Sequence, residues 1–354
     1  MNALLVSLNF NPGHFSHLIA NYKLFEEDGL TPYLYVNRSF NEMDEENQYR
    51  KINNLDQLNI LDKIQVAVFW FPSLRNIIEV IRLRFFFNTK IFYVYHEPFD
   101  SIKNYYSSGF KLSKIAKICL INLVNIPILL LSHKIILPSN SSLILYKKKY
   151  AFLNRNYFYM PLLFDDEVEK LSENTPKNVI SYIGTIAADH AFDKFVAFVK
   201  IALENNWFPS LTFLIATKSI IPPIEKKILE KYLSLGMVVV QEGKPMRNTE
   251  INKHFQNSLV VWNAYHRSMQ SGVLPKAYMF GTPVIVLQKN KNEFIENNIT
   301  GILIMDNENA EEIKNAVQEI LEKRTYFFQN CRKKFIDTFY YKGKINLFHS
   351  FLFK

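Results

Sequence analysis

Cysteine, glycine and uninterrupted apolar runs are scarce in this sequence. The two cysteines, Cys119 and Cys331, lie far apart and outside any CxxC or histidine-spaced cluster, which fits a reducing compartment and no structural zinc. None of the eight histidines has metal-ligand spacing to carboxylates, so we predict no metal site and a metal-independent activity. The first residues, MNALLVSLNF, lack the basic start and cleavage site of a signal peptide and predict a buried first strand.

Acidic residues are outnumbered, 33 against 42 lysines and arginines, which gives a net charge of +9. Such a charge favours a polyanionic partner: nucleic acid, anionic lipid headgroups or a phosphorylated small molecule. The sequence has no RNP, KH, zinc-finger or helix-turn-helix signature, so we expect no nucleic-acid partner. The length of 354 residues and 48% hydrophobic content predict a folded protein with two domains.

Part of the positive charge lies in two apolar stretches, residues 74–90 and 109–134. Two interpretations remain open: core helices with solvated basic ends, or a basic, aromatic face that rests on an anionic membrane. The second stretch is interrupted by Asn122, Asn125 and Pro127 and falls short of the roughly 20 uninterrupted apolar residues that a span needs. We therefore expect a peripheral membrane contact at most.

Segments typical of strands and helices alternate along the chain. Continuous apolar runs predict parallel strands covered on both faces, at residues 3–9, 31–36, 65–71, 90–97, 134–139, 179–184, 211–216, 237–241 and 258–262. Amphipathic segments predict helices at 17–29, 191–206, 223–236 and 249–257, with a basic helix and a long helix in the first half. The fold class is α/β, with two doubly wound, Rossmann-like domains. The polar residues 165–178 read as the linker between them.

Residues 270–286, QSGVLPKAYMFGTPVIV, combine a Ser-Gly turn, a short helix and a Pro-led strand. Ser271 is a suitable N-cap, Gly272 lets a ligand approach the backbone, and the first helical turn offers unpaired N–H donors. This predicts an anion site at the start of the helix. Gly281, just after Phe280, suits a left-handed position that ends the helix.

This run, followed by Glu293 and by Gly301 in TGILI, resembles the nucleotide-sugar site of group 1 glycosyltransferases with the GT-B fold. The resemblance extends over most of the chain through NFNPGHFSH, YVYHEPFD, KIILPSNSS, MPLLFDD and SYIGTIAADHAFDKF. It implies an N-terminal acceptor-binding domain at residues 1–164 and a C-terminal donor-binding domain at 165–330. It also implies that residues 331–354 cross back to the N-terminal domain.

The sequence departs from this family at charged positions. Where the family has an E-x7-E pair, this chain has Ser268 and Lys276, and Thr185 and His190 replace basic residues of the donor loop. A lysine can only donate hydrogen bonds, so Lys276 suits a phosphate rather than a ribose hydroxyl. The cations left for a diphosphate are Lys218, Arg247, Arg267 and Lys276.

The candidate site residues follow from these patterns. His96 and Glu97 end a strand of the first domain, where they could contact the acceptor or act as a base, and Lys276 could stabilise the leaving diphosphate. The donor-binding candidates are Gly184, Thr185, His190, Lys218, Arg247, Tyr265, Arg267, Gln270, Ser271, Gly272 and Val273. The acceptor-binding candidates are Gly13 and His14.

The resemblance implies a retaining glycosyltransferase that moves a sugar from a nucleotide-diphosphate donor to a saccharide, with no cofactor besides that donor. We expect a lipid-linked acceptor, a role in bacterial surface polysaccharide synthesis and a cytoplasmic location, peripheral on the inner membrane. Two alternatives stay open: a non-catalytic nucleotide-sugar-binding or scaffold subunit, which the lost acidic pair favours, and a nucleotide-sugar epimerase.

Overall fold

The computed structural model describes residues 2–10, 12–43, 48–57, 63–168, 176–267 and 271–353. The chain forms two compact units: unit 1 comprises Met1–Asp165 and Phe339–Lys354, and unit 2 comprises Asp166–Thr338. Where the sequence predicts boundaries after residues 164 and 330, contacts divide the chain after residues 165 and 338. The last segment thus returns to unit 1, where the Phe164 N–H donates a hydrogen bond to the Phe339 carbonyl at 2.9 Å.

Unit 1 is built on a parallel sheet in the order β3-β2-β1-β4-β5-β6-β7. The strands are β1 (Asn2–Ser7), β2 (Thr31–Val36), β3 (Lys51–Ile52), β4 (Ile64–Trp70), β5 (Lys90–Val94), β6 (Lys134–Leu137) and β7 (Asn156–Tyr159). Their apolar side chains are buried on both faces, because helices cover the sheet on each side. The order reverses direction between β1 and β4, which is the switch point of this sheet.

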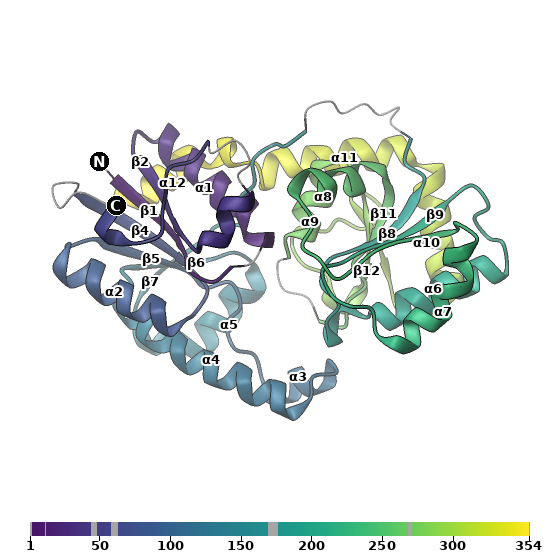
Figure 1. The fold of residues 1–354 in the computed structure, drawn as a ribbon, viewed down its shortest axis with the longest axis horizontal. Coiled ribbons are helices and arrows are strands. Elements are labelled where there is room, and N and C mark those ends of the chain that lie inside the picture. Colours follow the sequence, from purple (N-terminus) through teal and green to yellow (C-terminus); the bar gives the residue numbers. More distant parts are fainter. Residues whose placement is uncertain are drawn as a thin grey trace. The chain divides into compact units, whose positions relative to one another are not determined.

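Helices lie on both faces of the unit 1 sheet (Figure 1). They are α1 (Phe15–Glu27), α2 (Leu74–Phe86), α3 (Ile102–Ser107), α4 (Leu112–Leu131), α5 (Asn140–Tyr150) and α12 (Ile345–Phe353). Buried residues of α2, α4 and α5 share one core with the sheet. On the other face Phe348 of α12 meets Phe25 of α1, with ring centroids 4.9 Å apart, and Phe351 stacks on Phe158.

Unit 2 repeats this plan with a parallel sheet in the order β10-β9-β8-β11-β12-β13. The strands are β8 (Val179–Ile183), β9 (Thr212–Ala216), β10 (Val238–Gln241), β11 (Ser258–Trp262), β12 (Val284–Leu287) and β13 (Gly301–Ile304). The helices are α6 (Phe192–Glu204), α7 (Pro223–Ser234), α8 (Asn248–Asn257), α9 (Val273–Met279), α10 (Ala310–Glu322) and α11 (Arg324–Thr338). Helices α6, α7 and α10 cover one face, and α8, α9 and α11 cover the other (Figure 1). The switch point lies between β8 and β11.

The structure confirms the predicted fold class: two doubly wound α/β units with parallel sheets. It also corrects local expectations. Asn122, Asn125 and Pro127 do not interrupt the second apolar stretch, because α4 runs through them as one helix of 20 residues. The short strands β3 and β7 are additions at the two sheet edges, where a strand needs little apolar sequence.

The polar segment 165–178 is anchored at both described ends, although it has no periodic apolar pattern. Asp166 pairs with the Arg332 guanidinium, and Glu167 pairs with Lys276. Lys177 is buried and donates to the carbonyls of Phe255, Gln256 and Ser258 at the end of α8. The ends of the segment are therefore fixed to unit 2 by charge and hydrogen bonds rather than by apolar packing.

Candidate functional site

The loops at the two switch points are the expected ligand-binding regions of the two units. In open parallel sheets, ligands bind beyond the carboxyl ends of the strands where the strand order reverses. In unit 2 these are the loops that follow β8 and β11, and in unit 1 the loops that follow β1 and β4. Most of the predicted site residues lie in these four loops or next to them.

His190 and Tyr265 stack on one another at the switch point of unit 2. Their ring centroids are 4.4 Å apart and the rings are within 10° of parallel. The His190 Nδ1 lies 2.6 Å from the Thr185 carbonyl, which orients the ring. The two loops are tied together because the Asp189 carbonyl accepts the His266 N–H at 2.7 Å. Burial raises the pKa of Tyr265, with the Asp189 charge acting in the same direction, so its hydroxyl stays protonated.

Gly184 brings the end of β8 close to the start of α9. Its φ of +140° is readily adopted only by glycine. A Cβ at this position would lie 3.5 Å from Val273 Cγ2 and 3.9 Å from the Tyr265 hydroxyl. The predicted donor residues Gly184, Thr185, His190, Tyr265 and Val273 therefore converge in one place. Sequence reasoning missed Asp189, which joins the loops through its backbone and leaves no mark in a residue pattern.

The start of α9 differs from the prediction. Gly272, not Ser271, is the N-cap residue, and the Ser271 hydroxyl accepts the Val273 N–H at 3.2 Å. The helix has seven residues and ends at Met279, one residue earlier than expected. The N–H of Val273 is thus already satisfied by a side chain. Gln270 and Ser268 lie outside the described residues.

Lys276 is held by other residues of unit 2. Its buried ammonium donates to Glu167 at 2.5 Å, to Asn252 at 2.9 Å and to Asn248 at 3.0 Å. An ammonium has three N–H donors, and these three oxygens can accept all of them. In this conformation Lys276 organises the start of unit 2 with its three donors engaged there, and its role at a diphosphate stays a prediction.

Glu167 is the counterion that sequence reasoning missed, because it lies 109 residues away along the chain. It also accepts from the side-chain amides of Asn248 and Asn252, the latter at 2.8 Å. Burial raises the pKa of Glu167, but the charge and hydrogen bond of Lys276, with the two amides, outweigh burial and lower it below 4.5. Glu167 is therefore ionised at neutral pH.

The other predicted cations lie around the same sheet edge. Lys218 follows β9, and its side chain is exposed as a whole. Partial burial of its ammonium lowers its pKa. Its loop is joined to the β8 loop because the Ile186 N–H donates to Ser219. Arg247 is exposed at the N-cap of α8, and its N–H donates to Glu250 at 2.8 Å. Arg267 follows the stacked tyrosine by two residues, and its side chain is half-buried.

The switch point of unit 1 carries a second stacked histidine. His14, next to Gly13 in the loop after β1, lies parallel to Phe71 with ring centroids 3.7 Å apart. His96 is also near Phe71, with their ring centroids 6.0 Å apart. Phe71 has a left-handed φ of 61°, an uncommon conformation for an aromatic residue, and its carbonyl accepts the Asn76 amide at 2.5 Å. Sequence reasoning missed Phe71, although an aromatic residue at the end of a central strand could have indicated it.

His96 is suited to accept a proton. Burial lowers its pKa below 6.5, against the weaker opposing effect of Glu97, so the imidazole is neutral at pH 7. Glu97 itself is exposed, and Pro98 after it keeps the segment extended. The structure therefore brings His14, Phe71 and His96 together in unit 1, with Glu97 at the rim.

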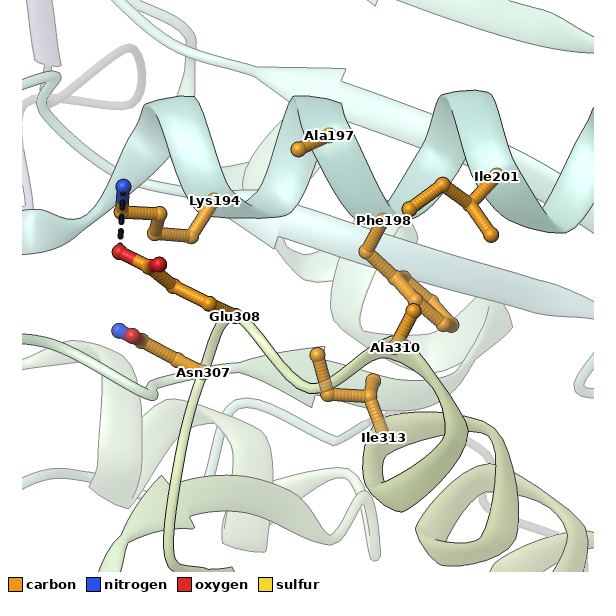
Figure 2. Close-up of a pocket in the computed structure, with 8 residues that line it drawn as sticks. All are labelled: Lys194, Ala197, Phe198, Ile201, Asn307, Glu308, Ala310 and Ile313. Carbon is orange, nitrogen blue, oxygen red and sulfur yellow. Dashed lines mark ion pairs between the residues drawn. The ribbon is translucent and has the colours of Figure 1, made fainter.

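A small pocket lies between α6 and the start of α10 (Figure 2), and its lining residue Asn307 donates to the Ala264 carbonyl in the loop after β11. It is about 140 Å³, lined by apolar residues such as Phe198 and Ile313, and its rim carries the ion pair between Lys194 and Glu308 at 2.8 Å. Pockets for small ligands are typically about 300–1,000 Å³, so this one is too small for a nucleotide sugar. Among the residues that the structure describes, no group of three or more His, Cys, Asp or Glu could hold a metal ion.

Comparison with known proteins shows which family model unit 2 matches and which fold the chain shares. Residues 177–323 match the model of the family described as Glycosyl transferases group 1, which spans most of unit 2 and confirms the expected resemblance. The whole chain has the GT-B fold of solved glycosyltransferases. No curated protein sequence matches the chain significantly.

Three solved structures illustrate the likeness. HepE from Anabaena, in complex with UDP, is 12% identical with a TM-score of 0.68, and the alignment covers 99% of both chains. Sucrose-phosphate synthase from Thermosynechococcus elongatus is 14% identical with a TM-score of 0.69, over 99% of this chain and 98% of that one. A glycosyltransferase from Rickettsia africae is 12% identical with a TM-score of 0.65, over 99% and 97%. The TM-scores over nearly the full length of both chains show the shared fold.

Proposed function

We propose that this protein is a glycosyltransferase that binds a nucleotide-diphosphate sugar on unit 2 and transfers the sugar to a saccharide bound on unit 1. One observation carries the proposal: the His190–Tyr265 stack and the close approach of Gly184 to Val273 form a shaped backbone surface at the switch point of the family-matched unit. Doubly wound sheets bind nucleotides at this position.

On the donor side, the diphosphate needs positive charge. Lys218, Arg247 and Arg267 lie in the loops around the stack, and arginine pairs well with phosphate oxygens. We propose uridine-diphosphate sugars as the first donors to test, because the structurally similar HepE has been solved with UDP and with UDP-glucose.

On the acceptor side, the parallel His14 and Phe71 rings offer an aromatic face for a sugar ring. The neutral imidazole of His96 could accept a hydrogen bond or proton from the acceptor hydroxyl. We propose a retaining reaction without a metal ion or any cofactor besides the donor. In a retaining reaction the leaving diphosphate can guide the acceptor proton, and His96 then positions the acceptor.

We further propose that the acceptor is lipid-linked, and that the protein works in surface polysaccharide assembly at the cytoplasmic face of a membrane. The net charge of +9 supports an anionic surface as a partner. Product analysis tests this proposal: the labelled sugar should partition into the organic phase when a membrane extract supplies the acceptor.

The first experiment is a thermal-shift screen with uridine-, guanosine-, thymidine- and cytidine-diphosphate sugars in metal-free buffer. At about 100 times the dissociation constant, a ligand adds about 2.7 kcal/mol and should raise the melting temperature of the unit that binds it by about 5–10 °C. Gly184→Ala should abolish the shift, because residues with a side chain rarely adopt a φ of +140° and alanine would distort the loop beside Val273 and Tyr265. Gly236→Ala is the matched control, since Gly236 also has a positive φ but nothing within 4 Å.

No shift with any of the four donors would contradict the proposal, as would an equal loss in both glycine variants. Transfer that stops in a chelator and returns with magnesium would overturn the metal-independent part alone. Nuclear magnetic resonance of the product's anomeric centre distinguishes retention from inversion.

A non-catalytic nucleotide-sugar-binding subunit is the second candidate. The observation that favours it is the engagement of Lys276 by Glu167, Asn248 and Asn252, which leaves an expected catalytic group without a free donor. Binding of a donor with neither transfer nor slow hydrolysis would support this candidate. Release of an altered nucleotide sugar without any acceptor would instead indicate an epimerase.

A further inference from the structure

Helix α4 turns its two asparagines, Asn122 and Asn125, toward the inside of unit 1. Asn125 accepts the Tyr93 hydroxyl at 2.5 Å, and Asn122 accepts the hydroxyls of Tyr95 at 3.1 Å and Tyr150 at 2.5 Å. All three tyrosines belong to the buried core of unit 1. A helix of a water-soluble domain normally shows the opposite arrangement, with polar residues facing the solvent.

The outer side of α4 is apolar. Leu112, Leu120, Leu123 and Leu130 are 68%, 64%, 59% and 41% exposed. Their spacing places them on one stripe along the helix, opposite the buried Ile128 and Leu129. The exposed apolar residues therefore form a continuous stripe and are not scattered.

Helix α2 continues this surface. It packs beside α4 on the same face of the unit 1 sheet (Figure 1). Its buried side carries Val80 and Leu83, and its outer side exposes Leu74, Ile78 and Phe85 at intervals of four and seven residues. Phe86 is also 81% exposed. We call the outer sides of α2 and α4 together the α2–α4 face.

Cations are exposed at the starts of the two helices that form this face. Lys111, Lys114 and Lys117 are exposed at the start of α4, and Arg75 is exposed at the start of α2. An apolar surface of this extent is unusual on a monomer that meets only water. A second copy related by a two-fold axis would bring these same cations face to face. An anionic lipid surface offers both acyl chains for the leucines and headgroups for the lysines.

The length and hydropathy of α4 would also allow it to cross a membrane. Crossing would require the helix to leave the sheet, however. The hydrogen bonds of Asn122 and Asn125 to three tyrosines would break, and the fully buried Ile128 and Leu129 would leave the core. The contacts of α4 therefore favour a helix that lies in the membrane interface while its inner side stays packed.

We propose that the α2–α4 face docks on an anionic lipid bilayer, with its apolar stripes in the headgroup region and its cations against the lipid phosphates. This inference deepens the proposed function by naming the surface where the protein would meet a lipid-linked acceptor. Only this link to the acceptor rests on the proposed function. Docking itself requires neither donor nor acceptor.

The test is flotation of the full chain with vesicles of phosphatidylglycerol and phosphatidylcholine, compared with vesicles of phosphatidylcholine alone. We expect binding to the anionic vesicles at about 0.05 M salt, weakened at about 0.5 M salt by screening. Leu120→Gln with Leu123→Gln should reduce the partition coefficient by about tenfold or more, because both outward leucines lose their apolar contact. The matched control is Ile224→Gln with Leu235→Gln, two apolar residues of unit 2 that are 74% and 58% exposed, and should bind as the parent does.

Lys114→Gln with Lys117→Gln is a second variant that leaves the apolar stripe intact and should lose most of the preference for anionic lipid. The proposal is overturned if the parent does not float with anionic vesicles, or if the control pair loses binding as much as the leucine pair. It is also overturned if the parent is a dimer without lipid and the leucine variant is a monomer. The thermal shift with donor should be the same in all of these variants, so failure of docking and failure of donor binding are distinguishable.

Discussion

Lys276 and Glu167 illustrate, at the residue scale, how a substituted family position can change its partner. The ammonium and carboxylate are largely buried and 2.5 Å apart, and two asparagine amides complete the cluster. Removing one member of a buried pair leaves the other charge uncompensated, whereas replacing both by apolar side chains can be nearly neutral.

We expect Lys276→Ala to lower the free energy of unfolding by about 3 kcal/mol. Lys276→Met combined with Glu167→Leu should recover most of this loss, because no buried charge remains unpaired. Urea denaturation followed by circular dichroism measures both values. If Lys276→Ala keeps its stability but loses transfer activity by more than tenfold, the lysine acts on the substrate and not in the cluster.

The same pair predicts a dependence of stability on pH. The pKa of Glu167 is lower in the folded protein than its ordinary value of 4.5, so the unfolded chain binds the proton more readily. The stability that this carboxylate contributes is present above pH 4.5 and is lost as the pH falls through its lowered folded value. Glu167→Gln should therefore lose less stability than the parent between about pH 5 and pH 3, measured by urea midpoints at each pH. Parallel curves for the two proteins would contradict the assigned pKa shift.

At the scale of elements, the sequence indicated most of the framework. The central strands are nearly continuous runs of apolar residues, so their burial between helices was predictable. The edge strands β3 and β7 were missed because they are short and have one neighbour each. Which side of α4 faces the core could not be predicted either, because its sequence is apolar on most sides. Only the hydrogen bonds from Tyr93 of β5 and Tyr150 of α5 show that its asparagines face inward.

The sequence correctly predicted that a glycine in a left-handed conformation follows α9. Gly281 has a φ of +63°, and a Cβ there would lie 2.4 Å from Phe328 Cδ2 of α11. The stacked and paired site residues were less predictable, because His190 with Tyr265, and Glu167 with Lys276, come from distant parts of the chain. The family motif indicated which loops would form the site. It could not indicate which side chains contact each other, because this depends on the direction of each side chain.

Gly281→Ala should destabilise the protein by about 2–4 kcal/mol, from the left-handed backbone and from the contact with Phe328 together. Gly236→Ala, with a φ of +69° and nothing within 4 Å, should cost only the backbone part, about 1–2 kcal/mol. The difference between the two unfolding free energies measures the α9–α11 contact. Equal losses would show that Phe328 moves aside without cost.

At the scale of the whole molecule, the division into two units implies that ligand stabilisation is local. The predicted donor residues lie in unit 2, and the aromatic group of His14, Phe71 and His96 lies in unit 1. A ligand stabilises only the cooperative unit to which it binds, unless the two units unfold together.

We therefore expect calorimetry to resolve two unfolding transitions, of which UDP raises only one. The transition of unit 2 is identified independently, because Glu167→Gln should lower it and leave the transition of unit 1 unchanged. At about 100 times its dissociation constant, UDP adds about 2.7 kcal/mol and should raise that same transition by about 5–10 °C. If UDP instead raises the transition that Glu167→Gln leaves in place, the nucleotide binds unit 1. The assignment of donor and acceptor to the two units is then reversed, although the fold and the family match stay as they are.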